Sequence, residues 1–131
     1  MYYFVKPYEP PEEPVNYIPK EKEKKTYEGT ELCARVLQAE AENQPEEGKR
    51  LVVDCILNRV DSPEFPGTVE EVCNQTNAFA ISNKTPSEED YRIVEEEMIN
   101  RTDTEVLYFR TDDYHKFGTP VKQVGSHYFS K

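Results

Sequence analysis

One glutamate, Glu40, lies where a carboxyl group is energetically costly. Residues 31–42 have the spacing of an amphipathic helix, on which Glu40 points within about 20° of Cys33, in the middle of the apolar stripe. Burial disfavours the carboxylate anion, and a protonated carboxylic acid at the wall of a cleft can act as a general acid on a glycosidic bond. The position equally suits a structural glutamate paired with Arg35 or Arg59.

The two histidines, His115 and His127, do not indicate a metal centre. No carboxylate or cysteine cluster is spaced to join them, so we expect neither a metal ion nor a cofactor. Ser126 beside His127 is not a catalytic pair either, because nucleophile and base are recognised by geometry and not by adjacency. We expect His127 to make an orienting hydrogen bond near Glu40, or to be a buried histidine with its hydrogen bonds satisfied.

The three cysteines, Cys33, Cys55 and Cys73, lie in separate apolar segments and form no C-x-x-C pair. We expect reduced, buried thiols. A single Cys33–Cys55 bridge is the alternative.

The elements that must position these residues come in the order helices first, then strands. Helices are expected over about 31–42, from about Pro45 through Val60, over about 69–74, and from a cap at Ser87 or Thr85 to about Asn100. Thr30 and Thr68 are expected as further N-caps. Strands are expected over 105–110, 120–124 and 126–130. This order predicts an α+β domain with a short C-terminal sheet.

Composition divides the chain into two parts. Residues 1–28 hold half of the prolines and show no apolar periodicity, which predicts a tail or linker before a single domain over 29–131. Hydrophobic residues make up only 36% of the chain, which also indicates that part of it is unpacked. The N-terminal stretch has no apolar core, so we do not expect it to be a signal peptide.

The charge of −10 excludes some classes of partner. Binding to a nucleic-acid backbone or to anionic lipid needs a basic face, so neither is expected, although an acidic decoy for a basic protein would fit. No apolar run is long enough to span a membrane. Within the acidic domain, residues 114–131 carry three lysines and no acid, and we expect a local patch there that faces an anionic surface.

Several segments in the correct order resemble the SleB-type cell wall hydrolases, the spore cortex-lytic family. Residues 40–48 (EAENQPEEG) are similar to the family pattern E-A-x-G-E-P-x-x-G. Further similar segments are 31–41 (ELCARVLQAEA), 56–60 (ILNRV), 62–69 (SPEFPGTV), the pair Gln75 and Phe79, and 121–129 (VKQVGSHYF). The resemblance covers residues 29–131.

The resemblance implies a lysozyme-like lytic transglycosylase fold and cleavage of peptidoglycan glycan strands between N-acetylmuramic acid and N-acetylglucosamine. It implies Glu40 as the catalytic acid and base, the residue that the helical wheel singles out independently. Candidate substrate-binding residues are Asn58, Gln75, Phe79, Tyr108 and His127. Structural roles for Asn58 and Phe79 are the alternatives, and one of Tyr108 and Phe109 is expected in the core and the other at the cleft.

At two positions the sequence departs from the family pattern, and these departures suggest an alternative function. The second glutamate of the first motif is Gln44, and a later Ser or Thr is Ala80. A two-carboxylate hydrolase would lose an essential group, whereas a transglycosylase needs one glutamate. The alternative function is a peptidoglycan-binding module without turnover. The route to the wall stays open: a phage lysis or virion-associated protein, a fragment, and unconventional export each fit.

Overall fold

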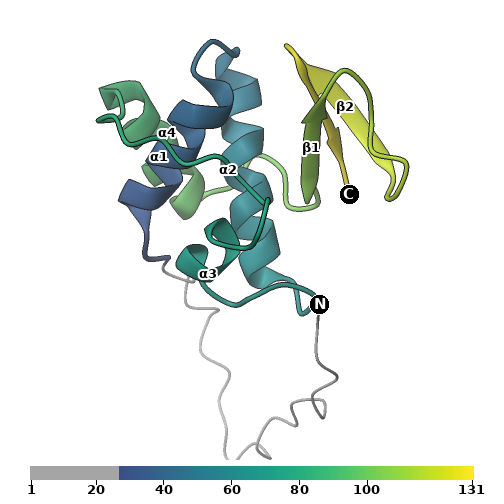
Figure 1. Ribbon diagram of the computed structural model, residues 1–131, viewed down its shortest axis with the longest axis horizontal. Helices are drawn as coiled ribbons and strands as arrows, with labels where there is room; N and C mark the ends of the chain where they lie inside the picture. Colours follow the sequence, from purple (N-terminus) through teal and green to yellow (C-terminus); the bar gives the residue numbers. More distant parts are fainter. Residues whose placement is uncertain (1–26) are drawn as a thin grey trace, which may run out of the picture.

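The computed structural model describes residues 27–131, so the expected tail lies almost entirely outside the described residues. Within the described part, helices precede a three-stranded antiparallel sheet (Figure 1). The elements are α1 (Thr30–Ala41), α2 (Glu46–Asp61), α3 (Val69–Cys73), α4 (Glu88–Ile99), β1 (Tyr108–Thr111), β2 (Pro120–Val124) and β3 (His127–Ser130). The α+β prediction is confirmed. No helix in this part of the chain is long and apolar enough to cross a membrane.

Side-chain caps start two of the helices where the sequence predicts them. The Thr68 hydroxyl accepts a hydrogen bond from the Glu71 N–H, at 3.1 Å, before α3. Ser87 and Asp90 form a reciprocal capping box before α4, which decides between the two expected caps. α2 begins one residue later than expected, with Pro45 in the cap position.

The start of α1 differs from the prediction. Gly29 is the cap residue, at φ 107°, and Thr30 is already helical. The backbone at Gly29 lies so close to α3 that an added Cβ would stand 2.8 Å from a methyl carbon of Val69. Only glycine combines the left-handed conformation with this close approach, so the expected Thr30 cap was wrong.

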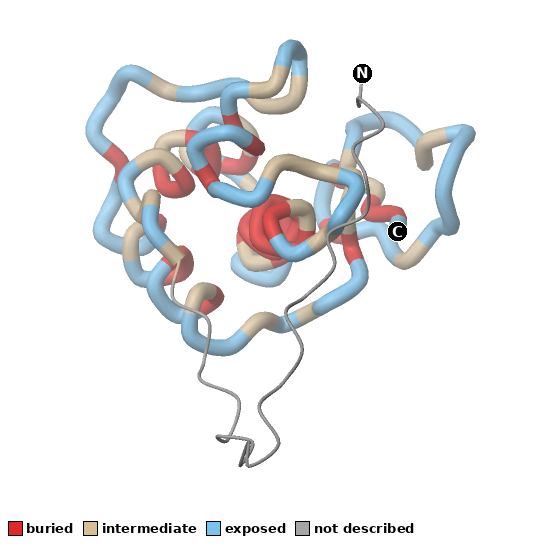
Figure 2. Tube along the Cα trace, turned by 90° about the horizontal axis from the view of Figure 1, so that it is seen from below, coloured by how far each residue is buried: buried red, intermediate tan, exposed pale blue. Residues whose placement is uncertain are grey.

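α2 is the centre of the fold. Eleven of its sixteen residues are buried, and the view from below shows one helix end-on, buried over most of its surface, with other segments around it (Figure 2). The three cysteines lie in this core as free thiols, one each on α1, α2 and α3. The prediction of reduced, buried cysteines is therefore confirmed, and the Cys33–Cys55 bridge is absent.

The sheet stands beside the helices, with strand order β1-β3-β2 (Figure 1). β1 begins at Tyr108, three residues later than the alternating sequence predicts. The reason is a local turn: the Asp103 carboxylate accepts hydrogen bonds from the N–H groups of Glu105 and Val106, at 2.7 and 3.0 Å. Those two residues therefore cannot enter the ladder.

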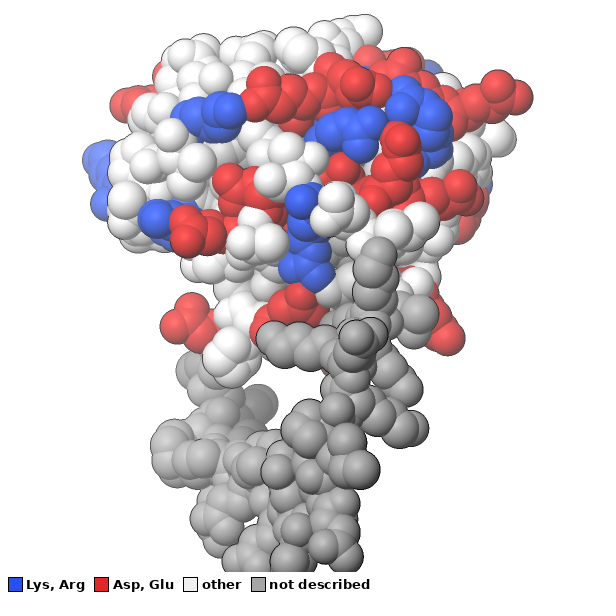
Figure 3. Space-filling model, turned by 180° about the vertical axis from the view of Figure 1, so that it is seen from behind, with Lys and Arg blue, Asp and Glu red and all other residues white. Residues whose placement is uncertain are grey.

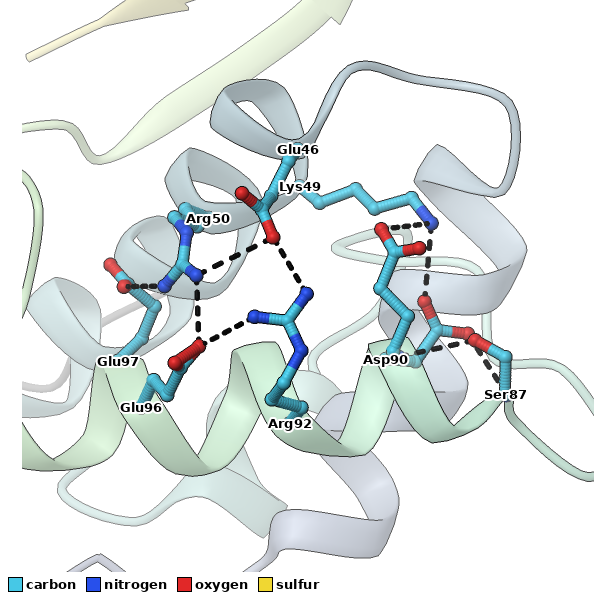
Figure 4. A network of polar contacts seen from close by, with 9 residues as sticks. Glu46, Lys49, Arg50, Ser87, Asp90, Arg92, Glu96 and Glu97 are labelled. Atoms are coloured by element: carbon cyan, nitrogen blue, oxygen red, sulfur yellow. Dashed lines mark hydrogen bonds and ion pairs between the residues drawn. The ribbon is translucent and has the colours of Figure 1, made fainter.

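Charged side chains join α2 to α4. Arg50 binds Glu96 and Glu97, both at 2.9 Å, and Arg92 binds Glu46 at 2.7 Å (Figure 4). On the surface seen from behind, basic and acidic side chains alternate (Figure 3). The acidic charge is thus partly neutralised within the fold.

The expected basic patch over 114–131 is smaller than its sequence indicates. Lys122 forms an ion pair with Glu47, and Lys131 forms one with Glu105. Of the three lysines, Lys116 alone has no ion pair within residues 27–131.

Two carboxyl groups meet in the interior between α2 and α4. Asp54 is 0% exposed and Glu97 is 2% exposed. Burial, together with a hydrogen bond to Glu97, raises the pKa of Asp54 to about 9. Burial also opposes the Glu97 anion, but the hydrogen bonds from Asp54, Thr102 and Arg50 outweigh it, so the pKa of Glu97 is lowered. The pair therefore holds one proton at neutral pH.

This pair predicts stability that declines towards alkaline pH. The folded chain keeps the Asp54 proton that the unfolded chain releases near pH 4, so the free energy of unfolding should fall as the pH rises from about 5 to about 9. Asp54→Asn should flatten this slope, because the amide replaces the protonated acid. Urea unfolding followed by circular dichroism across this range measures it. Equal slopes in both proteins would contradict the assignment.

Candidate active site

Glu40 lies in the last turn of α1, at the point where the apolar stripe of the helix leaves the core. Cys33 and Leu37 on the same stripe are fully buried, whereas Glu40 is half-buried. Its Oε1 accepts a hydrogen bond of 2.6 Å from the backbone N–H of Ala80. This contact fixes the carboxyl group at the surface with its second oxygen, Oε2, available.

The segment that carries Ala80 is held along α1 by hydrogen bonds. The Ser82 N–H donates to the Arg35 carbonyl at 3.1 Å, and the Gln38 amide donates to the Thr85 carbonyl at 3.1 Å. The Ala80 N–H is therefore positioned by main-chain and side-chain contacts of the residues that follow it. Any residue other than proline supplies the same donor at position 80.

His127, the first residue of β3, packs against the end of α1. It is 3% exposed, with its ring centroid 4.9 Å from that of Phe109. Burial lowers the pKa of His127, while the charge of Glu40 and a hydrogen bond to the Glu40 main chain act in the opposite direction. Its Nδ1 is buried and has no hydrogen-bond partner within residues 27–131. His127 thus lies at the same cavity as Glu40, and its imidazole is neutral at pH 7.

Two adjoining cavities open along the side of the molecule where Glu40 lies. The first, of about 240 Å³, is lined by Glu40, Arg59, Ala78, Phe79, Phe109, Arg110, Thr111 and His127. The second, of about 350 Å³, is lined by Arg59, Gln75, Thr76, Asn77, Ala78, Tyr108, Phe109, His115 and Phe117. They share three lining residues, and we call them together the groove. Glu40 is the only acidic residue among those that line it.

Arg59 lies between the two cavities, and the sequence analysis considers it only as a partner of Glu40. Its Nε donates to the Leu107 carbonyl at 2.7 Å. Its guanidinium carbon lies 4.8 Å from the ring centroid of Phe79 and 5.3 Å from that of Tyr108. The guanidinium group therefore contacts an aromatic ring that lines the first cavity and one that lines the second. The place of Arg59 in the family-like segment 56–60 (ILNRV), near the end of a buried helix, is the sequence feature that could have pointed to it.

Four of the five candidate substrate-binding residues line the groove. Phe79 and His127 share the first cavity with Glu40, while Gln75 and Tyr108 line the second. Phe109 contacts both cavities, so neither it nor Tyr108 is confined to the core. No signal in the sequence predicts that β1 residues such as Thr111 line the groove.

Asn58 lies apart from the groove. Its amide nitrogen donates to the carbonyls of Asp103 and Val106, at 3.0 and 2.8 Å, and its oxygen accepts from Arg101 at 2.7 Å. It borders a different hollow of about 560 Å³. Asn58 therefore has the structural role that was the alternative to substrate binding, because it ties α2 to the segment before β1.

Metal ligation has no candidate in this region. Residues 27–131 contain no group of three His, Cys, Asp or Glu side chains that could hold a metal ion.

The family model of the cell wall hydrolases matches residues 43–130. The chain belongs to this family. The match begins three residues after Glu40, so the assignment of that residue rests on the geometry above and on the resemblance of residues 40–48. No curated protein matches this cell wall hydrolase.

Two solved structures resemble this cell wall hydrolase over most of their length. The catalytic domain of the Bacillus cereus SleB protein has 27% identity and a TM-score of 0.70, over 78% of this chain and 88% of that domain. The catalytic domain of a germination-specific lytic transglycosylase, SleB from Bacillus anthracis, has 27% identity and a TM-score of 0.69, over 78% and 93%. The predicted SleB-type fold is therefore confirmed.

Gln44, which replaces a family glutamate, joins the loop after α1 to the turn between β2 and β3. Its Oε1 accepts from the Ser126 N–H at 2.8 Å, and its Nε2 donates to the Ser126 hydroxyl at 3.3 Å. The turn approaches so closely that a Cβ on Gly125 would lie 2.2 Å from the Gln44 Oε1. This contact holds the start of β3, and hence His127, against α1.

These contacts predict a structural role for position 44. Gln44→Ala should lower the free energy of unfolding by about 1 kcal/mol, because it removes both hydrogen bonds. Gln44→Glu should cost less, because a carboxylate accepts the same N–H and the Ser126 hydroxyl can donate to it. Denaturant unfolding of the three proteins measures the difference. A larger loss for Gln44→Glu than for Gln44→Ala would contradict this role.

Proposed function

We propose that this cell wall hydrolase cleaves peptidoglycan glycan strands between N-acetylmuramic acid and N-acetylglucosamine, with Glu40 as the catalytic residue. The observation that carries the proposal is the single carboxyl group in the groove, fixed through one oxygen by the Ala80 N–H. The relation to a germination-specific lytic transglycosylase supports the same reaction. The substrate is a wall polymer, so the proposed place of action is the cell wall.

One carboxyl group is sufficient for a lytic transglycosylase. Glu40 first donates its proton to the glycosidic oxygen as the bond to C1 of the muramic acid breaks. The resulting carboxylate then accepts the proton of the 6-hydroxyl of the same sugar, whose oxygen bonds to C1 and closes a 1,6-anhydro ring. An inverting or retaining hydrolase would need a second carboxylate across the bond, and no other acidic residue among 27–131 lines the groove.

The neighbours of Glu40 have different roles in this proposal. Phe79 offers an apolar surface to a sugar ring in the first cavity, and Gln75 and Tyr108 offer polar atoms in the second. His127 is a positioning residue, since it is almost fully buried and contacts the main chain of Glu40. A neutral imidazole there forms no ion pair with Glu40.

Replacement of one carboxyl group tests the assignment. Glu40→Gln should reduce the release of muropeptides with anhydromuramic ends from purified peptidoglycan at least about a hundredfold, because the amide can neither donate nor accept the proton. Glu42→Gln is the matched control, since Glu42 is exposed and absent from the groove lining. Mass spectrometry of the digest identifies the ends.

Three outcomes would overturn parts of the proposal. Undiminished release by Glu40→Gln would remove the residue from catalysis. Reducing ends in place of anhydro ends would show hydrolysis. Retention on insoluble peptidoglycan without any product from the wild-type chain would favour the binding module.

A further inference from the structure

The loop between β1 and β2 places an exposed aromatic ring at the groove. Phe117 is 56% exposed, which is unusual for a phenylalanine, and it lines the second cavity. Two other large apolar residues within 27–131 are exposed, Ile81 and Ile99, and neither lines the groove. The exposed apolar surface of Phe117 therefore coincides with the groove.

Neighbouring rings hold Phe117 in place. Its ring centroid lies 4.6 Å from that of His115, with the planes 29° apart, and 5.0 Å from that of Tyr108, at 87°. The chain then returns to the sheet through Gly118, at φ 79°, where an added Cβ would stand 2.7 Å from the Lys131 carbonyl. These contacts make the ring a fixed part of the wall.

The second cavity has the composition of a saccharide site. Its aromatic wall is formed by Tyr108, His115 and Phe117, and two side-chain amides, Gln75 and Asn77, also line it. Aromatic surfaces bind the apolar faces of sugar rings, and amides can pair with acetamido groups. No acidic residue lines it. The cavity continues into the one that holds Glu40.

We propose that the loop between β1 and β2 forms a second saccharide subsite, in which Phe117 and Tyr108 contact an N-acetylated amino sugar that is not part of the cleaved bond. The inference rests on the proposed function, because that function identifies the bound polymer as a peptidoglycan glycan strand. Its consequence is that affinity for glycan strands rises at the chain length that reaches this cavity from Glu40.

The subsite is tested by binding, with cleavage blocked. Glycan oligosaccharides from disaccharide to octasaccharide are titrated into Glu40→Gln by calorimetry, alone and combined with Phe117→Ala, Phe117→Tyr or Ile99→Ala. Phe117→Ala should weaken binding about tenfold only for oligosaccharides long enough to reach the loop, and Phe117→Tyr should retain the affinity. Ile99→Ala removes a similarly exposed apolar side chain, 67% exposed and outside the groove, and should leave binding unchanged.

The outcomes separate this inference from the proposed function. An equal loss at every length, or no loss at any, overturns the subsite while cleavage by the wild-type chain still supports the function. A length-dependent loss in a chain that cleaves nothing supports the subsite and overturns the catalytic proposal. Unchanged thermal midpoints of the Phe117 variants exclude unfolding as the cause.

Discussion

The burial of α2 on nearly every side is the constraint on which the rest of the structure depends. A helix surrounded by other elements must satisfy each of its polar groups inside the fold. One oxygen of Asp54 accepts a hydrogen bond from the Asp103 N–H and Asn58 donates one to the Val106 carbonyl, both in the chain that leads into β1. Arg59 donates to the Leu107 carbonyl just before that strand. The same interactions place β1, and with it Phe109, along the groove. The core helix therefore determines the position of one wall of the proposed active site.

The carboxyl groups of the protein differ in their partners according to where they lie. On the α2–α4 face, exposed glutamates such as Glu96 are matched by arginines, so part of the acidic charge of the chain is paired there. In the interior, Asp54 and Glu97 share a proton because two anions could not be buried together. In the groove, Glu40 has no ion-pair partner within residues 27–131, and a backbone N–H fixes it without neutralising it. An unpaired, positioned carboxyl group is what proton transfer requires.

The two departures from the family pattern concern positioning in this structure. Gln44 holds the turn before β3 through both atoms of its amide, and Ala80 supplies a main-chain N–H that does not depend on its side chain. Both act on the surroundings of Glu40, one through His127 and the other directly. The substitutions that favoured a binding module in the sequence are therefore compatible with an intact catalytic site.

The sequence by itself determined the order of elements, the helix cap at Thr68, the reduced cysteines and the family, because these depend on local spacing and side-chain chemistry. It also placed Glu40 on the apolar face of α1, since the helical period is a local property. The groove was decided by the tertiary structure alone. Its walls come from α2, the segment after α3, β1, the loop between β1 and β2, and the start of β3, and only packing brings Arg59 and Phe117 to the groove that holds Glu40. Asn58 shows the limit most clearly: a polar residue on a helix reads the same whether it faces a ligand or the protein's own backbone, and only long-range contacts decide between them.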